Sequence, residues 1–280
     1  METITRKTML YKTGVEYGDY TMNHVSGCSH GCLYPCYAFL MAKRFGKIAN
    51  YETWCAPKLV SNTLEILDRE IPRMKSKIKS VQLCFTTDPF MFGYEQVAEM
   101  SMAAIKKLNK AGIRCTILTK GLLPIELAEQ FSENEYGITL ISLNENYRQR
   151  IEPGASHYAD RIAALKALHN KGCRTWVSIE PYPTPNLIQQ DLVEILNAVS
   201  FTNKIIFGRT NYSKEVTSFT THKAFYNEQV DIVVDFCQQN NINYHIKNGT
   251  ITDKKDNANL DNPHKKQDLE TFLEREGTVF

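Results

Sequence analysis

Residues 27–46 read GCSHGCLYPCYAFLMAKRFG, and this short stretch contains three of the eight cysteines in the chain. Cys28, Cys32 and Cys36 are separated by three residues each, a C-x3-C-x3-C pattern. Thiolates are the ordinary ligands of iron–sulfur clusters, and a [4Fe–4S] cube has four irons to coordinate. Three cysteines leave one of those irons without a protein ligand, so the pattern favours a cluster with an open iron.

Zinc is the alternative metal for this stretch. A structural zinc ion takes four protein ligands, commonly cysteines combined with histidines. His24 or His30 would have to supply the fourth ligand here, and His30 is the better placed because it lies inside the cysteine loop. The remaining cysteines are scattered singly, at Cys55, Cys84, Cys115, Cys173 and Cys237. Cys84, Cys115 and Cys237 lie in apolar runs and are interpreted as small buried hydrophobes.

The composition is that of an ordinary soluble globular protein, with 280 residues, 42% hydrophobic residues and 23% charged residues. No signal-peptide core opens the sequence, and no uncharged apolar run reaches the roughly 18 residues that a membrane span needs. We therefore expect a cytoplasmic protein with no membrane association and mostly free thiols. A net charge of +2 does not support a nucleic-acid partner, although basic clusters at 42–47 and 73–80 leave one open.

Short β-rich runs alternate with segments that have helical apolar spacing, which predicts an α/β fold with parallel strands and right-handed crossovers. The architecture is either a barrel or an open doubly wound sheet. We divide the chain into an N-terminal extension (1–19), a core domain (20–250) and a polar C-terminal tail (251–280). The predicted strands are 20–25, 80–86, 113–119, 137–143, 173–179, 203–208 and 242–246.

Polar segments follow nearly every predicted strand, among them TTDPF at 86–90, TKG at 119–121 and EPYPTP at 180–185. In parallel α/β folds the ligand site is built from the loops at the carboxyl ends of the strands. The cysteine stretch follows the first predicted strand and therefore opens onto the same face. These loops together predict a lined cavity beside the cysteines.

The motif GCSHGCLYPCYA, placed after a first strand and followed by repeated βα units, resembles the radical S-adenosylmethionine (SAM) superfamily, whose signature is C-x3-C-x2-C. Together with TTDPF it resembles the branch that includes spore photoproduct lyase, and HGCLYPCYAFLMAKRFG resembles radical SAM mobile pair proteins. The resemblance covers roughly residues 20–250. It implies a partial (β/α)6 TIM-type barrel with the cluster loop after the first strand, a [4Fe–4S] cluster held by Cys28, Cys32 and Cys36, and SAM as the second cofactor.

One departure from the signature is Pro35, which lengthens the second gap to three residues. The family places an aromatic ring against the SAM adenine just before the last cysteine. Tyr34 and Tyr37 flank this position, and the resemblance does not say which of them contacts the adenine.

The resemblance also assigns roles to residues at the strand ends. Thr87 and Asp88 would accept the SAM ammonium group, Lys120 would pair with its carboxylate, and Ser142 would bind the ribose. Arg161 either binds SAM or pairs with Glu152.

Glu180 would line the cofactor and substrate cavity, together with Arg209, Asn211 and Lys247. Cys84 is the nearest candidate for a hydrogen-atom donor, but it lies one residue further from Asp88 than the spore photoproduct lyase pattern requires. A shift of one residue turns a strand side chain to the opposite face, which predicts that Cys84 belongs to the core.

The resemblance implies reductive cleavage of SAM to a 5′-deoxyadenosyl radical, which abstracts hydrogen from an unknown substrate in lyase- or transferase-type chemistry. An electron donor such as flavodoxin or ferredoxin and a second radical SAM protein are the implied partners. Two alternatives remain open. One is a non-catalytic iron–sulfur or zinc-binding protein, and the other is an enzyme that repairs or modifies nucleic acid.

Overall fold

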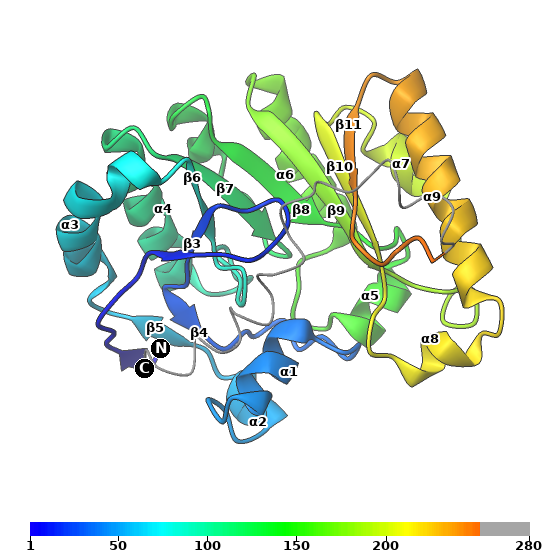
Figure 1. Ribbon diagram of the computed structural model, residues 1–280, viewed down its shortest axis with the longest axis horizontal. Helices are drawn as coiled ribbons and strands as arrows, with labels where there is room; N and C mark the ends of the chain where they lie inside the picture. Colours follow the sequence, from blue (N-terminus) through cyan, green and yellow to red (C-terminus); the bar gives the residue numbers. More distant parts are fainter. Residues whose placement is uncertain (253–280) are drawn as a thin grey trace.

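The computed structural model describes residues 1–252, in which a curved eight-stranded sheet lies inside a layer of helices (Figure 1). The strand order is β11-β10-β9-β8-β7-β6-β3-β2, and every neighbouring pair is parallel except β2 with β3. Sequential strands lying side by side are the arrangement of a partial barrel, so the α/β prediction is confirmed. The strands are β2 (Tyr11–Lys12), β3 (Tyr20–Met22), β6 (Ser80–Leu83), β7 (Arg114–Thr119), β8 (Glu135–Thr139), β9 (Arg174–Tyr182), β10 (Lys204–Arg209) and β11 (Asn243–Ile246).

Helices connect these strands and bury their apolar faces against the outside of the sheet. The longer helices in Figure 1 are α3 (Thr63–Met74), α4 (Glu95–Lys110), α6 (Tyr158–Asn170) and α9 (His222–Gln239). The shorter ones are α1 (Tyr37–Arg44), α2 (Tyr51–Trp54), α5 (Glu145–Ile151), α7 (Leu192–Ala198) and α8 (Lys214–Ser218), with 3-10 turns η1 (Lys75–Lys77) and η2 (Ile125–Glu129). In the described residues, no helix is both long and apolar enough to cross a bilayer.

The strand alternation explains how the core forms. In β7 every second side chain is buried, and Cys115, Ile117 and Thr119 face the same way. Cys115, Cys84 and Cys237 are all buried, as expected for cysteines in apolar runs. The core is therefore the layer between the sheet and its helices.

The strand predicted over 20–25 is interrupted in the structure. β3 ends at Met22, and β4 (Val25–Ser26) joins a second sheet, ordered β1-β5-β4, with β1 (Thr3–Ile4) and β5 (Lys58–Val60). Asn23 causes the break, because its carbonyl accepts from the Arg6 guanidinium and its side chain accepts from the backbone N–H of Thr86. The chain therefore turns out of the barrel just before the cysteine stretch.

Residues 1–19, predicted as an extension, pack onto the core through β1, β2 and the buried side chains Met9 and Leu10. Of the predicted tail, residues 253–280 lie outside the described residues. The remaining strand predictions agree with the structure to within a few residues, with the largest shift at β8.

Candidate functional site

The cysteine loop runs from β4 to α1 and is held in place by its backbone. Gly27 has φ +86°, and a Cβ there would lie 2.6 Å from the carbonyl oxygen of Trp54. The next residue, Cys28, donates its N–H to that same oxygen at 2.9 Å. Cys36 is the N-cap of α1, so its thiol lies at a helix N-terminus. Only glycine permits the close approach of the loop to α2 that begins this segment.

The three thiols of the cysteine loop are free and half-buried. Burial raises the pKa of Cys36 to about 11, although backbone N–H groups of Phe39 and Ala38 act in the opposite direction by donating to the sulfur. Burial also raises the pKa of Cys28 and Cys32. A metal ligand must lose its proton, so a bound cation would replace these protons and stabilise the thiolates.

The donor set distinguishes between the two metals considered. Both ring nitrogens of His30 are engaged, Nε2 with Asp88 Oδ2 at 2.9 Å and Nδ1 with the Gly154 carbonyl at 3.2 Å. His24 is engaged equally, with Ser101 Oγ at 2.8 Å and Cys84 Sγ at 3.5 Å. Within residues 1–252 no three His, Cys, Asp or Glu side chains converge on one metal ion. Neither histidine is therefore free to complete a zinc site, and the three remaining thiols are the donors that an iron–sulfur cluster takes.

The contact between His30 and Asp88 ties the cysteine loop to the barrel. Asp88 accepts four hydrogen bonds, from His30, from the Thr119 hydroxyl at 2.6 Å, and from the backbone N–H groups of Phe90 and Lys120, both at 2.8 Å. Burial raises the pKa of Asp88, but the charge of His30 and these donors outweigh it and lower the pKa overall. Asp88 therefore joins the ends of β6 and β7 to the middle of the loop.

Glu152, which is fully buried, is the centre of a second charge cluster beside Cys32. Its Oε1 lies 2.8 Å from Lys120 Nζ and accepts from the Tyr34 hydroxyl at 3.1 Å. Its Oε2 lies 3.1 Å from both terminal nitrogens of Arg161. Lys120 Nζ is also 3.5 Å from Cys32 Sγ and 4.6 Å from the centre of the Tyr34 ring. The Glu152 cluster thus places an ammonium group directly against one thiol.

The charges in the Glu152 cluster support each other. Burial raises the pKa of Glu152, but Lys120 and Arg161 outweigh it and lower that pKa. Burial lowers the pKa of Lys120, but the nearby Cys32 and Glu152 outweigh it and raise that pKa. The sequence left two roles open for Arg161, and the structure shows it paired with Glu152 and fully buried.

Gly154 completes the backing of the cysteine loop. Its N–H donates to the His30 carbonyl at 2.9 Å, and a Cβ there would lie 2.2 Å from the Ser29 carbonyl oxygen. Nearby, the Leu33 N–H donates to the Ile151 carbonyl at 2.8 Å. Residues 151–154 therefore act as a backbone support for the loop.

The other predicted site residues lie apart from these contacts. Ser142 is buried, and its hydroxyl accepts from the Asn144 N–H at 3.0 Å. The Thr87 hydroxyl is buried and has no hydrogen-bond partner among the described residues. Burial raises the pKa of the nearby Cys84 thiol to about 12, and Thr87 acts in the opposite direction. Tyr37, the first residue of α1, is 51% exposed, whereas Tyr34 is held by Glu152 and Lys120.

Glu180 belongs to a separate network at the last strands. It lies 3.5 Å from Lys247, which is 3.8 Å from Glu16, and Glu16 also contacts His245 at 3.1 Å. Burial raises the pKa of Glu180, with Lys247 acting against it. Close by, Arg209 Nε donates to Asn211 Oδ1 at 2.9 Å.

Two contributions were missed at the sequence level. Glu16 and Tyr17 come from the hairpin between β2 and β3, and Tyr17 packs against Phe85, Trp176 and His245 inside the barrel. Cys55 is close enough to the cysteine loop to affect the pKa of Cys36. The Tyr51 hydroxyl interacts with Cys55 and also donates to the Cys32 carbonyl. These contacts join segments far apart in the chain, so no local motif could indicate them.

Residues 22–199 match the model of the Radical SAM superfamily, which is more than half of the chain, and the protein belongs to this superfamily. Members of the superfamily use a [4Fe–4S] cluster and SAM, which are therefore the cofactors of this chain.

An uncharacterized protein of Methanocaldococcus jannaschii is 28% identical over 211 residues, which cover 74% of this chain and 76% of that protein. An uncharacterized protein of Acidianus two-tailed virus is 25% identical over 196 residues, and the match covers 66% of this chain and 64% of the viral protein. This chain therefore spans less than two thirds of the viral relative.

Among solved structures, spore photoproduct lyase complexed with dinucleoside spore photoproduct has a TM-score of 0.62 at 13% identity, covering 86% of this chain and 80% of the lyase. A variant of that lyase with bound SAM has a TM-score of 0.59 at 15% identity, covering 84% of this chain and 78% of the variant. At this level of identity the likeness shows a shared fold.

Proposed function

We propose that this protein reductively cleaves SAM and uses the resulting 5′-deoxyadenosyl radical to abstract hydrogen from a substrate. The observation that supports the proposal best is the set of three free thiols in one loop, with Lys120 3.5 Å from Cys32 Sγ. A [4Fe–4S] cluster bound to Cys28, Cys32 and Cys36 would supply the electron that breaks the sulfonium bond of SAM.

The residues around the thiols have distinct roles in this proposal. Lys120 compensates the negative charge of the Cys32 thiolate and would pair with the SAM carboxylate. Asp88 orients the loop through His30, because its two oxygens already accept four hydrogen bonds. Its predicted contact with the SAM ammonium, and that of Thr87, stay untested predictions, as does the ribose contact of Ser142.

The ring that contacts the adenine is Tyr37 in this proposal. The Tyr34 hydroxyl bonds Glu152 and one face of its ring is covered by Lys120, so it is committed to the protein interior. Tyr37 is 51% exposed at the start of α1, directly after Cys36, and its ring is available to stack. Glu180, Arg209, Asn211 and Lys247 line the substrate side of the barrel.

Several finer points belong to the same proposal. The protein acts in the cytoplasm, takes its electron from flavodoxin or ferredoxin, and works with a second radical SAM protein. The reaction is of the lyase or transferase type. A nucleic-acid substrate would be indicated by a DNA- or RNA-dependent rise in SAM cleavage that high salt abolishes.

The test is low-temperature electron paramagnetic resonance of anaerobically reconstituted, dithionite-reduced protein with and without SAM, combined with chromatography of 5′-deoxyadenosine and methionine. We expect a cluster signal that SAM shifts, together with formation of 5′-deoxyadenosine and methionine. The Cys32→Ala variant should lose the cluster signal and form neither product. Cys115→Ala is the control, because Cys115 is buried in the core and should leave the signal intact. A cluster that is indifferent to SAM and yields no 5′-deoxyadenosine would refute the proposal.

A further inference from the structure

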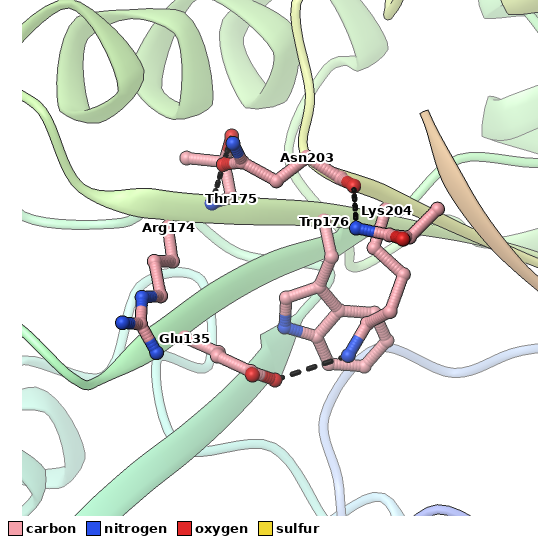
Figure 2. Close-up of a pocket in the computed structure, with 7 residues that line it drawn as sticks. Glu135, Arg174, Thr175, Trp176, Asn203 and Lys204 are labelled. Carbon is pink, nitrogen blue, oxygen red and sulfur yellow. Dashed lines mark hydrogen bonds and ion pairs between the residues drawn. The ribbon is translucent and has the colours of Figure 1, made fainter. Parts of the chain in front are cut away.

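Four parallel strands begin side by side at the end of the barrel opposite to the cysteine loop. Their first residues are Glu135 in β8, Arg174 in β9, Lys204 in β10 and Asn243 in β11. These residues border a cavity of about 340 Å³ that also touches Trp176 (Figure 2). Because the cysteines follow the other ends of the strands, this cavity is separate from the SAM site.

The strand register places five of the seven lining residues on one face of the sheet. Trp176 pairs with Lys204, which pairs with Asn243, and Glu135 pairs with Arg174 two residues earlier. Residues paired directly across a sheet share a face, and so do residues two apart. The cavity is therefore built from the inward face of the barrel at its amino end.

The charged groups around the cavity leave a positive excess. Lys204 Nζ lies 3.0 Å from Glu135 Oε2, and Arg114 lies 3.4 Å from the other oxygen of the same carboxylate. Arg174 is 2.8 Å from Glu133 on the protein surface. These five side chains comprise three cations and two carboxylates. Glu135 is compensated by two cations, so its charge does not exclude an anion from the cavity.

Trp176 supplies an unused hydrogen-bond donor at the wall of the cavity. The residue is 1% exposed, and its Nε1 is buried without a hydrogen-bond partner among the described residues. Figure 2 shows the indole nitrogen on the side of the ring toward Arg174 and Glu135. An unpaired buried donor is costly and rare in folded proteins, so its position points to an acceptor that the chain itself does not provide.

The surroundings fix the indole in this orientation. A Cβ at Gly137 would lie 2.4 Å from the indole, so glycine is required on the neighbouring strand. Tyr17 contacts the indole edge with ring centres 6.2 Å apart, and the Lys204 ammonium lies 5.3 Å from a ring centre of Trp176. The indole, and with it the Nε1 donor, is thus held in one orientation by its neighbours.

We propose that this cavity is a second binding site, for a small molecule that carries an oxyanion, either a carboxylate or a phosphate group. The Trp176 N–H donates to the oxyanion, and Lys204 and Arg174 supply the compensating charge. The volume of about 340 Å³ holds roughly ten water molecules, which is at the lower end of small-molecule sites. The ligand is therefore no larger than a small metabolite.

The chain contains two tryptophans, which makes indole N–H signals in ¹⁵N-resolved NMR a direct probe. Trp54 lies in α2 beside the cysteine loop and serves as the internal reference, and Trp176→Phe assigns the two signals. Inorganic phosphate and acetate are titrated separately into the reconstituted protein at constant ionic strength. We expect one or both anions to move the Trp176 signal downfield with saturation, while the Trp54 signal stays in place.

Charge variants separate a built site from general salt effects. Lys204→Met should weaken the binding about tenfold or more, because it removes a charged partner of the anion. Lys107→Met is the matched control, since the Lys107 side chain is 29% exposed and paired with Asp68 just as Lys204 is 29% exposed and paired with Glu135. Thermal unfolding confirms that both variants are folded.

Saturation by phosphate alone identifies a phosphate site, and saturation by acetate alone identifies a carboxylate site. Either result, or saturation by both anions, supports the proposal when Lys204→Met weakens anion binding and Lys107→Met does not. A Trp176 signal that neither anion moves would overturn it, as would equal shifts in both lysine variants. The same titration in Cys32→Ala should be unchanged, which distinguishes this site from the SAM site.

Discussion

Replacing Glu152 with Gln removes the negative charge that two buried cations share. The substitution keeps the shape of the side chain, so its effect is electrostatic. Arg161 is fully buried and the Lys120 side chain is 15% exposed, with Glu152 itself fully buried between them. Arg161 therefore cannot reach bulk water without movement of the segments that cover it, and Lys120 reaches it only in part.

The expected loss follows from the burial of the pair. Breaking a buried ion pair by removing one partner costs about 3–5 kcal/mol, because the other charge is left uncompensated. Natural domains are stable by only about 5–15 kcal/mol. For a chain of this size the loss corresponds to a fall in melting temperature of roughly 6–20 °C. The variant should fold, but it should melt well below the wild type.

Urea unfolding followed by circular dichroism, with the thiols kept reduced and no iron present, measures this loss directly. Glu2→Gln is the matched control, since Glu2 makes an ion pair with Lys58 in which its side chain is 65% exposed. An exposed pair contributes about 0–1 kcal/mol, so the control should unfold almost as the wild type does. The double variant Glu152→Gln/Arg161→Gln should lose less than the sum of the two single losses.

Equal stability losses in Glu152→Gln and Glu2→Gln would refute this reasoning. They would mean that water reaches the Glu152 cluster and screens its charges. Strict additivity in the double variant would refute the pairing of Glu152 with Arg161 in the same way.

Three further predictions follow from the site. Cys36→Ser should lose most of the roughly four iron atoms bound per reconstituted chain, whereas Cys55→Ser should retain them, as iron and sulfide assays would show. Gly154→Ala should destabilise the fold by about 1–3 kcal/mol and reduce iron retention, because its Cβ would lie 2.2 Å from the Ser29 carbonyl oxygen; unchanged iron content would contradict this. The pKa of Asp88 lies below its usual 3.8, so the ionised carboxylate should stabilise the folded wild type above about pH 4, and this contribution should be lost as acid protonates it. Asp88→Asn should therefore have a smaller free energy of unfolding than the wild type at pH 7. Its stability should also fall less steeply with pH in an acid-unfolding curve.

The alternation of short β-rich runs with helical spacing predicted the barrel because each signal is local. Strand β7 shows this well, since buried Cys115, Ile117 and Thr119 alternate with half-buried residues in a run that the sequence displays directly. The strand over 20–25 was predicted as one element because its six residues are all compatible with extended backbone. The break at Asn23 depends on Arg6 and Thr86, which are 17 and 63 residues away, so no local pattern could show it.

The candidate site also combines features that the local sequence shows with features that depend on tertiary contacts. Three cysteines within nine residues indicated a cluster loop without any tertiary information. The pairing of Glu152 with Lys120 required the end of β7 to meet the end of α5, and the sequence offered pairing only as one alternative for Arg161. The hairpin between β2 and β3 brings Glu16 to His245, which lies 229 residues later in the chain, so the topology rather than the composition of the hairpin creates this contact.

The charges beside Cys32 explain why two cations surround one carboxylate. Glu152 with Arg161 alone is a neutral buried pair, and Lys120 then adds one positive charge to it. That surplus charge lies 3.5 Å from Cys32 Sγ, where ligation of iron requires a thiolate. With Cys32 protonated the cluster carries a net positive charge in the protein interior, and with Cys32 ionised it is neutral. Lys120 and Arg161 therefore favour the ionised, metal-binding form of the thiol, against the burial and the Glu152 charge that raise the pKa of Cys32.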